Sequence, residues 1–398
     1  MDGSNGERNF CLRNIISLLY GHCLINCVIT FQDIKAVPFS LLPSPTDDSS
    51  YGDFHRTSST FFTYFTPVIL TVGLVGNIIS LLVFRSSGMR KMSASLYLVS
   101  LALVDICVLV GYVLPEWIKH GVANNNPNTS FEFLEVNGIC QLRMFLAYFS
   151  RMASSWIIVA FTVERFTGVC YPLKSLQRHP MKILVGLTLA CCVLVMYKPF
   201  LSRPVTHRGG FVICSSMKEY QYEIFIVESL YVVSIFFVPL VIISVLNGSI
   251  MRTLFLRNTQ TGILTDSTNI RMEFTVILFA ISLCYAAFHL PYYIVWCRLQ
   301  IVTNPKSFVS RNSDFWDYWK GVLNLVRPIY YLNYCSNFFL YCITGAYFRS
   351  ELARILCCRD QRRHRYRTHI RASRMESLTR QSHLSATNGT ENYATYTA

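Results

Sequence analysis

The sequence predicts an all-α membrane protein: a bundle of seven transmembrane helices followed by a short amphipathic eighth helix. Hydrophobic residues make up 52% of its 398 residues and charged residues only 15%. Soluble proteins carry about 25% charged residues, so this chain has too little polar surface to cover a soluble body of its size. The composition therefore excludes a cytosolic enzyme, a disordered chain and a small disulfide-rich scaffold.

Apolar stretches of about the length that crosses a bilayer recur along the chain. The seven predicted spans cover residues 61–84, 93–114, 140–169, 181–200, 222–255, 274–299 and 321–343. They divide the chain into an extracellular N-terminal segment (1–60), the seven-helix domain (61–343), an amphipathic helix (344–358) and a disordered cytoplasmic tail (359–398). A further apolar stretch, 15–31, is short and interrupted by polar residues. We place it in the extracellular segment, and a cleaved signal peptide or an eighth span stay open as alternatives.

Basic residues set the predicted orientation. The loops after the first, third and fifth spans carry basic residues and almost no acids, namely Arg85, Arg90, Lys91, Lys174, Arg178, Lys182, Arg252, Arg257 and Arg271. Positive loops stay in the cytoplasm, so we expect an outer N-terminus, an inner C-terminus and a multi-pass protein of the plasma membrane. The densest basic run, 359–367, follows the last span and accounts for part of the net charge of +14. Such a run is typical of a membrane-facing tail and not of a nucleic-acid-binding surface.

This orientation gives meaning to several modifiable residues. Cys140 and Cys214 both face the oxidising side, and a disulfide between them would tie the second outer loop to the start of the third span. Asn128 begins an Asn-Thr-Ser glycosylation sequon in the first outer loop. Cys357 and Cys358 follow the amphipathic stretch on the inner side, where palmitoylation is expected.

A charged residue inside a span indicates function, because it is costly there. Asp105 lies in the middle of the second span, at a depth where Ser154, Asn333 and Asn337 could face it. Two interpretations stay open for this cluster. It could be a hydrogen-bonded plug that holds helices together, or a sodium or proton site whose occupancy favours one helix arrangement.

Polar and aromatic residues gather in the outer half of the predicted bundle. The arginines there could not face lipid cheaply, so they point into an aqueous pocket or pair with the two glutamates. Tyr231 and Tyr330 lie at the same depth. The predicted ligand-binding residues are Glu116, Arg143, Tyr148, Arg151, Glu228, His289, Tyr292, Tyr293, Trp296, Arg327 and Tyr331.

Several motifs in order resemble those of rhodopsin-like (class A) G-protein-coupled receptors over about residues 60–358. The resembling segments are Gly73 to Asn77, Leu101 to Asp105, the pair Cys140 and Cys214, Glu164-Arg165-Phe166, Val169 to Lys174, Pro239, Pro291, Asn337 to Tyr341, and Phe348-Arg349. The resemblance implies that Glu164, Arg165 and Tyr341 couple the receptor to a heterotrimeric G protein. It also implies that Ser and Thr residues of the tail, once phosphorylated by receptor kinases, recruit arrestin.

This sequence departs from the family pattern at several positions. Phe338 stands where the family has Pro, and His289 where helix six has Trp. Cys191 or Cys192 stands in place of the helix-four Trp, and Asn247 in place of the helix-five Tyr. Arg271 occupies the helix-six position where some members hold a Glu that pairs with the helix-three Arg. The resting state therefore cannot rely on that ion pair.

The resemblance also narrows the ligand class. Ala147 takes the position of the aspartate of amine receptors, and Tyr331 that of the Schiff-base lysine of opsins. The seventh span is similar to that of FMRFamide-type and thyrotropin-releasing-hormone-type receptors. In the latter a tyrosine, a second tyrosine and an arginine hold a small amidated peptide, and Tyr148, Tyr292 and Arg327 match them. We therefore expect a short, amidated neuropeptide.

Two alternatives stay open. The additional Arg143 and Arg151 favour a small acidic or carboxylate ligand. The motif departures suit a non-signalling seven-helix partner protein. No constellation of nucleophile, base or metal ligands indicates an enzyme, and the one cofactor considered is an allosteric sodium ion at Asp105.

Overall fold

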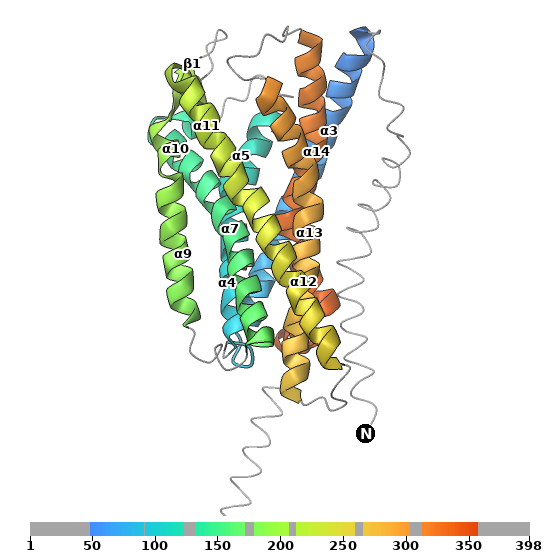
Figure 1. Ribbon diagram of the computed structural model, residues 1–398. Helices are drawn as coiled ribbons and strands as arrows, with labels where there is room; N and C mark the ends of the chain where they lie inside the picture. The colour runs from blue at the N-terminus through green and yellow to red at the C-terminus, as the bar shows by residue number, and fades with distance from the viewer. Residues whose placement is uncertain are drawn as a thin grey trace, which may run out of the picture. The chain divides into compact units, whose positions relative to one another are not determined.

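The computed structural model describes residues 48–90, 92–122, 132–171, 179–206, 212–258, 266–302 and 313–356 (Figure 1). Its elements are α3 (Asp48–Phe84), α4 (Ser93–Val108), η2 (Leu109–Val113), α5 (Leu114–Trp117), η3 (Ile118–Val122), η4 (Glu132–Glu135), α7 (Ile139–Cys170), α9 (Pro180–Val195), α10 (Tyr197–Phe200), β1 (Ser202–Thr206), β2 (Val212–Ser216), η5 (Lys218–Tyr220), α11 (Gln221–Val232), η6 (Val233–Phe237), α12 (Val238–Asn258), α13 (Asp266–Val302), α14 (Ser313–Thr344) and α15 (Ala346–Leu356). Each of the seven predicted spans falls within one continuous or nearly continuous helical segment, so the helical bundle is confirmed.

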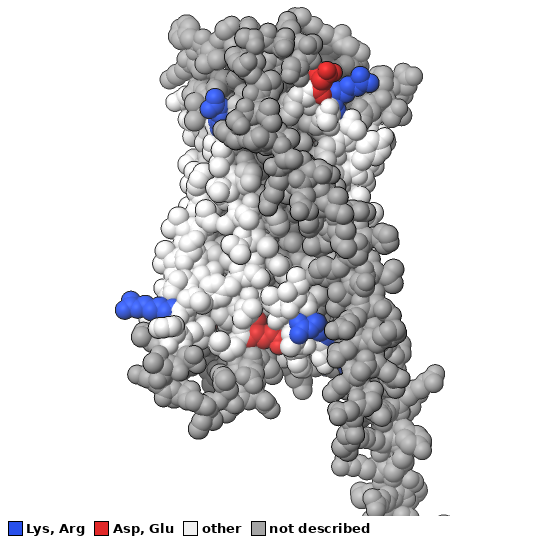
Figure 2. Space-filling view, turned by 90° about the vertical axis from the view of Figure 1, so that its right-hand side faces the viewer, with Lys and Arg blue, Asp and Glu red and all other residues white. Residues whose placement is uncertain are grey.

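Six of the described helical segments are long and apolar enough to cross a membrane. The seventh, α14, is not among them because its inward side carries polar residues such as Asn324, Asn333 and Asn337, all of which are buried. In Figure 2 the charged residues drawn in colour lie at the two ends of the visible face, and the middle is uncharged. This is the surface that a lipid bilayer requires.

Several helices run beyond the apolar stretches that predicted them. The first predicted span starts at residue 61, whereas α3 begins at Asp48; α13 and α14 also begin earlier than predicted. The backbone hydrogen bonds of a helix continue whether its side chains are polar or apolar. Hydropathy therefore marks only the part of a helix that lies in lipid.

Two π-helical segments interrupt the second and fifth helices. The first, η2, comes shortly before Pro115, and the second, η6, comes before Pro239. Proline lacks an N–H and clashes with the preceding turn, and a π turn is one way to relieve that conflict. Pro291 lies inside α13, and all three prolines bend helices whose outer ends surround the cavity described below.

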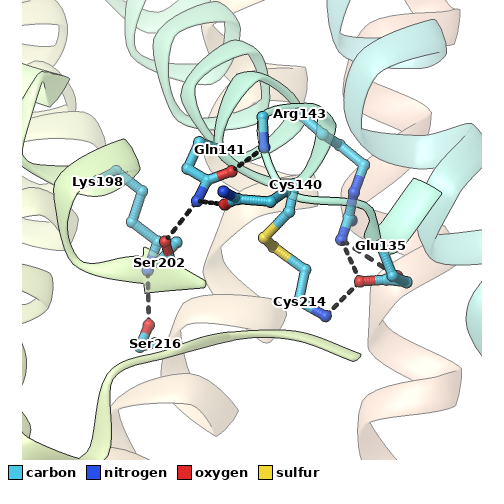
Figure 3. The surroundings of a disulfide bond; sticks show 10 residues. Glu135, Cys140, Gln141, Arg143, Lys198, Ser202, Cys214 and Ser216 are labelled. Atoms are coloured by element: carbon cyan, nitrogen blue, oxygen red, sulfur yellow. Dashed lines mark hydrogen bonds and ion pairs between the residues drawn. A yellow bond between two sulfur atoms is a disulfide. The ribbon is translucent and has the colours of Figure 1, made fainter. Parts of the chain in front are cut away.

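A short hairpin covers one end of the bundle, and the all-α prediction did not anticipate it. Strands β1 and β2 pair antiparallel, with Ser202 opposite Ser216 and Pro204 opposite Cys214. The predicted disulfide between Cys140 and Cys214 is present and ties β2 to the start of α7 (Figure 3). Glu135 accepts the backbone N–H of Cys214, which adds a second link beside the disulfide. We call this the disulfide end of the bundle.

Helices α3 and α14 approach each other closely because α3 has glycines where they meet. A Cβ added at Gly76 would lie 2.9 Å from the Cβ of Phe338, and one at Gly73 would lie 2.8 Å from Leu109. Asn77 lies next to them and donates a hydrogen bond of 2.8 Å to the carbonyl of Tyr334. Phe338, which stands in the place of a family proline, thus packs its side chain against a backbone with no side chain of its own.

One compact unit, within residues 36–349, contains the bundle and the start of α15. Residues 350–356 belong to a second unit, in which Arg354 pairs with Glu351 at 2.8 Å. Helix α15 coincides with the predicted amphipathic stretch.

Candidate functional site

A cavity of about 150 Å³ lies among the helices at the disulfide end. Nine of the eleven predicted ligand-binding residues line it: Glu116, Arg143, Tyr148, Arg151, Glu228, Tyr292, Tyr293, Trp296 and Arg327. The other lining residues are Gly111, Tyr112, Met144, Ala147, Tyr231 and Val232. Residues that are far apart in the sequence meet here because helices from both halves of the chain present one face each to the same space.

Helical periodicity explains which side chains reach the cavity. On α7, Met144, Ala147, Tyr148 and Arg151 follow one another at spacings of three, one and three residues, so they share one face. Tyr112 was not predicted as a ligand residue, although it stands four residues before Glu116 on the same face of its helix. That spacing was the sequence signal that could have found it.

Two predicted residues lie behind the cavity wall and not on it. His289 is fully buried, with its ring centroid 4.2 Å from that of Tyr285 and 4.9 Å from that of Tyr330. Tyr331 is also fully buried and packs edge-on against Tyr112. Helical spacing placed both on the right helices but could not distinguish the cavity face from the adjacent, packed face.

Glu228 forms the centre of a buried polar network on one side of the cavity. Tyr148 donates to both of its carboxylate oxygens, at 3.0 and 2.8 Å. Lys198 forms an ion pair with Glu228 at 2.5 Å and also donates to Ser216 of β2 at 3.2 Å. The network thus connects α7, α10, α11 and the hairpin. Sequence reasoning missed Lys198, whose signal was a single lysine near the end of an otherwise apolar span.

The arginines do not pair with the glutamates that the sequence suggested. Arg143 pairs instead with Glu135 at 3.4 Å, beside the disulfide (Figure 3). Glu116 lies 3.5 Å from the ring nitrogen of His120. Within the described residues, neither Arg151 nor Arg327 forms an ion pair with a carboxylate. The buried Nε of Arg327 has no hydrogen-bond partner there either.

Arg151 lies at the cavity wall among tyrosine rings. Its Nε donates to the carbonyl of Ala147 at 2.9 Å. The central carbon of its guanidinium lies 4.2 Å from the ring centroid of Tyr112, 4.7 Å from Tyr148 and 5.6 Å from Tyr231. These distances allow cation–π attraction, and the side chain retains only 7% exposure.

The predicted cluster around Asp105 assembles in the middle of the bundle. Ser154 donates to one carboxylate oxygen at 2.8 Å, and Asn337 donates to the other at 2.7 Å. Asn333 is buried, but the hydrogen bonds of Asp105 come from the other two residues. Asp105 is fully buried, and no Lys, Arg or His among the described residues forms an ion pair with it. A buried anion with neutral oxygen-bearing neighbours fits a small hard cation such as sodium.

The opposite end of α7 carries Glu164 and Arg165. They form the expected ion pair, and Glu164 also accepts a hydrogen bond of 2.7 Å from Ser93. The guanidinium of Arg165 lies 5.6 Å from the ring centroid of Phe274 on α13. Arg165 is therefore held by its neighbour and packed against α13.

A second contact holds the same end of α13. The carboxylate of Glu273 accepts the backbone N–H of Tyr347, the second residue of α15, at 2.7 Å. The first N–H groups of a helix lack partners within the helix, and a carboxylate near them is stabilising. Glu273 therefore caps α15 from a neighbouring helix. The side chain of Arg271 lies outside the described residues, as do Asn128, Cys357, Cys358 and the tail with their predicted modifications.

Comparison with known proteins identifies relatives over most of the chain. Residues 76–341 match the family described as 7 transmembrane receptor (rhodopsin family). Thyrotropin-releasing hormone receptor of Homo sapiens is 26% identical over 331 residues, which cover 74% of this chain and 77% of that receptor. A purinoceptor of Rattus norvegicus, purinoceptor 1, is 25% identical over 354 residues, which cover 80% of this chain and 90% of that receptor.

The buried pair of Lys198 and Glu228 generates a stability prediction. Replacing Lys198 by Met leaves Glu228 buried without its cation, which costs about 3 kcal/mol and lowers the midpoint of thermal unfolding in detergent. Adding Glu228→Gln to Lys198→Met removes the stranded charge and restores most of the lost stability. Arg203→Met is the matched control, because the ion pair of Arg203 with Glu219 is about half exposed and contributes less than about 1 kcal/mol. An unchanged midpoint for Lys198→Met alone would contradict this assignment.

Proposed function

The chain belongs to the rhodopsin family of seven-transmembrane receptors, and we propose that its extracellular ligand is a short peptide. Members of this family are multi-pass membrane receptors that signal through a heterotrimeric G protein, and they are not enzymes. The observation that carries the peptide proposal is the grouping of Tyr148, Tyr292 and Arg327 around one cavity. These three match the residues that hold a small peptide in thyrotropin-releasing-hormone-type receptors.

The chemistry of the cavity suits the end of a peptide. An arginine presents a planar fork of donors to carbonyl or carboxylate oxygens, and tyrosines add flat apolar surface with a polar tip. A cavity of about 150 Å³ admits a terminal residue or two and not a whole peptide. The remainder of the ligand would rest on the hairpin and the loops of the disulfide end.

Signalling follows from a shift between two helix arrangements. In the proposed orientation the disulfide end is extracellular, and the Arg165 end faces the cytoplasm. Ligand binding at Tyr292, Tyr293 and Trp296 biases α13, which bends at Pro291. Outward movement of its inner end separates Phe274 from Arg165 and opens a cleft in which Arg165 and Tyr341 meet the G protein. Arrestin and receptor kinases act on the Ser/Thr-rich tail.

The test of ligand class is a calcium-release screen in cells that express the chain with a promiscuous G protein. The library contains short peptides with free and amidated C-termini. It also contains purine nucleotides, because a purinoceptor is among the similar proteins. A peptide active at nanomolar concentration supports the proposal. Activation by purines alone, or silence in cells with confirmed surface expression, would overturn it.

Arg327 is expected to contribute directly to ligand affinity. Arg327→Ala removes a charged donor from the cavity, so we expect agonist potency to fall about 10- to 100-fold, as for the loss of a charge-assisted hydrogen bond. Surface expression, measured by antibody labelling of intact cells, stays unchanged. Arg298→Ala is the matched control, because Arg298 lies on α13 outside this cavity, over the ring of Trp319. Equal potency of Arg327→Ala and wild type would make Arg327 a structural residue.

The cap formed by Glu273 is expected to restrain the resting state. Glu273→Ala removes the link between α13 and the start of α15, and we expect basal G-protein activation to rise several-fold without ligand. Glu273→Gln keeps an oxygen that accepts the N–H of Tyr347, so its basal activity lies closer to wild type. Basal activity is measured by nucleotide exchange on purified G protein. A Glu273→Ala receptor as quiet as wild type would show that the contact does not oppose activation.

A sodium ion at Asp105 is proposed as an allosteric inhibitor, held by oxygens of Asp105, Ser154, Asn333 and Asn337. When bound, the ion compensates the charge of the buried carboxylate and favours the closed arrangement. Asp105→Asn keeps the size and one acceptor oxygen but removes the charge. Agonist affinity of wild type is therefore expected to fall as sodium replaces a large organic cation at constant ionic strength, and that of Asp105→Asn to stay constant. Sodium sensitivity that survives the substitution would remove this site.

A further inference from the structure

Arg151 is a nearly buried cation for which the described protein provides no anion. Its exposure is 7%, and its one hydrogen bond among the described residues runs from Nε to the carbonyl of Ala147. The nearby carboxylate of Glu228 is already engaged by Lys198 and Tyr148. Three tyrosine rings surround the guanidinium, but ring faces accept no conventional hydrogen bonds from its remaining N–H groups.

An isolated charge removed from water is destabilising unless a partner replaces the lost hydration. The cation–π contacts of Arg151 offset only part of that loss. Because Arg151 lines the cavity, the missing partner can arrive from outside the protein. This arrangement is the one expected for a residue that binds an anionic group of a ligand.

The charges around the cavity limit what this anion can be. Arg143 is matched by Glu135, and Glu228 is matched by Lys198. What remains is Arg151 and Arg327 against Glu116, which leaves one positive charge in excess. A ligand with a single negative charge complements this wall. A nucleotide di- or triphosphate carries several negative charges and would face two carboxylates at close range.

We infer that Arg151 binds the carboxylate of the ligand, and that this carboxylate is the free C-terminus of the peptide proposed above. A guanidinium can donate two parallel hydrogen bonds to a carboxylate, which an amide cannot match. The rings of Tyr112, Tyr148 and Tyr231 then surround the terminal residue. This inference rests on the proposed function and revises the amidated terminus that the sequence resemblance suggested.

A matched pair of small probes tests the assignment without the natural ligand. N-acetylphenylalanine has a free carboxylate, and N-acetylphenylalanine amide has the same shape without the charge. At millimolar concentration the acid is expected to raise the unfolding midpoint of the purified receptor by about 2 to 4 °C, and the amide to leave it unchanged. Arg151→Gln abolishes the shift, whereas Arg298→Gln, outside the cavity, retains it. Equal shifts by acid and amide, or a shift that persists in Arg151→Gln, would overturn the inference.

A second measurement separates ligand binding from a structural role. Without any probe, Arg151→Gln is expected to unfold at the same temperature as wild type or a higher one, because it removes an uncompensated charge. A structural arginine that stabilises the three tyrosines predicts a fall of several degrees, which would overturn the inference. The folded fraction, measured by size exclusion, is compared with wild type in each case.

The peptide screen keeps the two proposals distinguishable. If free-acid peptides activate the receptor and their amides are at least about 30-fold weaker, as for the loss of a bidentate charged contact, both proposals stand, and Arg151→Gln narrows the difference. If amidated peptides are equally active, the ligand is a peptide and the role of Arg151 is refuted. If no peptide acts but the acid probe stabilises wild type and not Arg151→Gln, the carboxylate site stands and the peptide proposal fails.

Discussion

The absence of water in a bilayer is the constraint on which this structure depends. Every backbone group and every charge at membrane depth must find its partner within the protein. Helices satisfy the backbone, and the polar side chains meet inside the bundle: Asp105 with Ser154 and Asn337, and Glu228 with Lys198 and Tyr148. Among the described residues, Arg151 without an anion and the unbonded Nε of Arg327 both lie at the cavity. In such a protein, an unsatisfied polar group beside a cavity indicates where a ligand belongs.

Helix α13 connects the cavity to the opposite end of the bundle. Tyr292, Tyr293 and Trp296 line the cavity on its outer part, and His289 lies one turn further in, stacked against Phe236. The same helix ends near Arg165 through Phe274 and near α15 through Glu273. A closely packed layer of aromatic rings transmits displacement because it is not easily compressed. A movement at the cavity wall therefore has a direct mechanical route to the G-protein-coupling end.

The departures from the family pattern have local physical explanations. A family glutamate on helix six is replaced by Arg271, and two residues later Glu273 provides a different restraint by capping α15. Phe338 replaces a proline, and its side chain packs over Gly76 of α3. In both places the position of one interaction has changed, but α13 and α14 are still held against the rest of the bundle. The bundle thus reaches similar closure with different contacts.

The sequence by itself determined the fold class, the order of the helices, the disulfide, and most of the residues around the cavity. Hydropathy and helical periodicity are local properties, and they specify which helix and which face a residue such as Tyr148 or Arg327 occupies. Only the tertiary structure decided which residues pair. Arg143 binds Glu135, Glu228 binds Lys198, and His289 lies behind the wall and not on it. The reason is that pairing depends on how helices rotate and approach one another, and that outcome is set jointly by side chains from all parts of the chain.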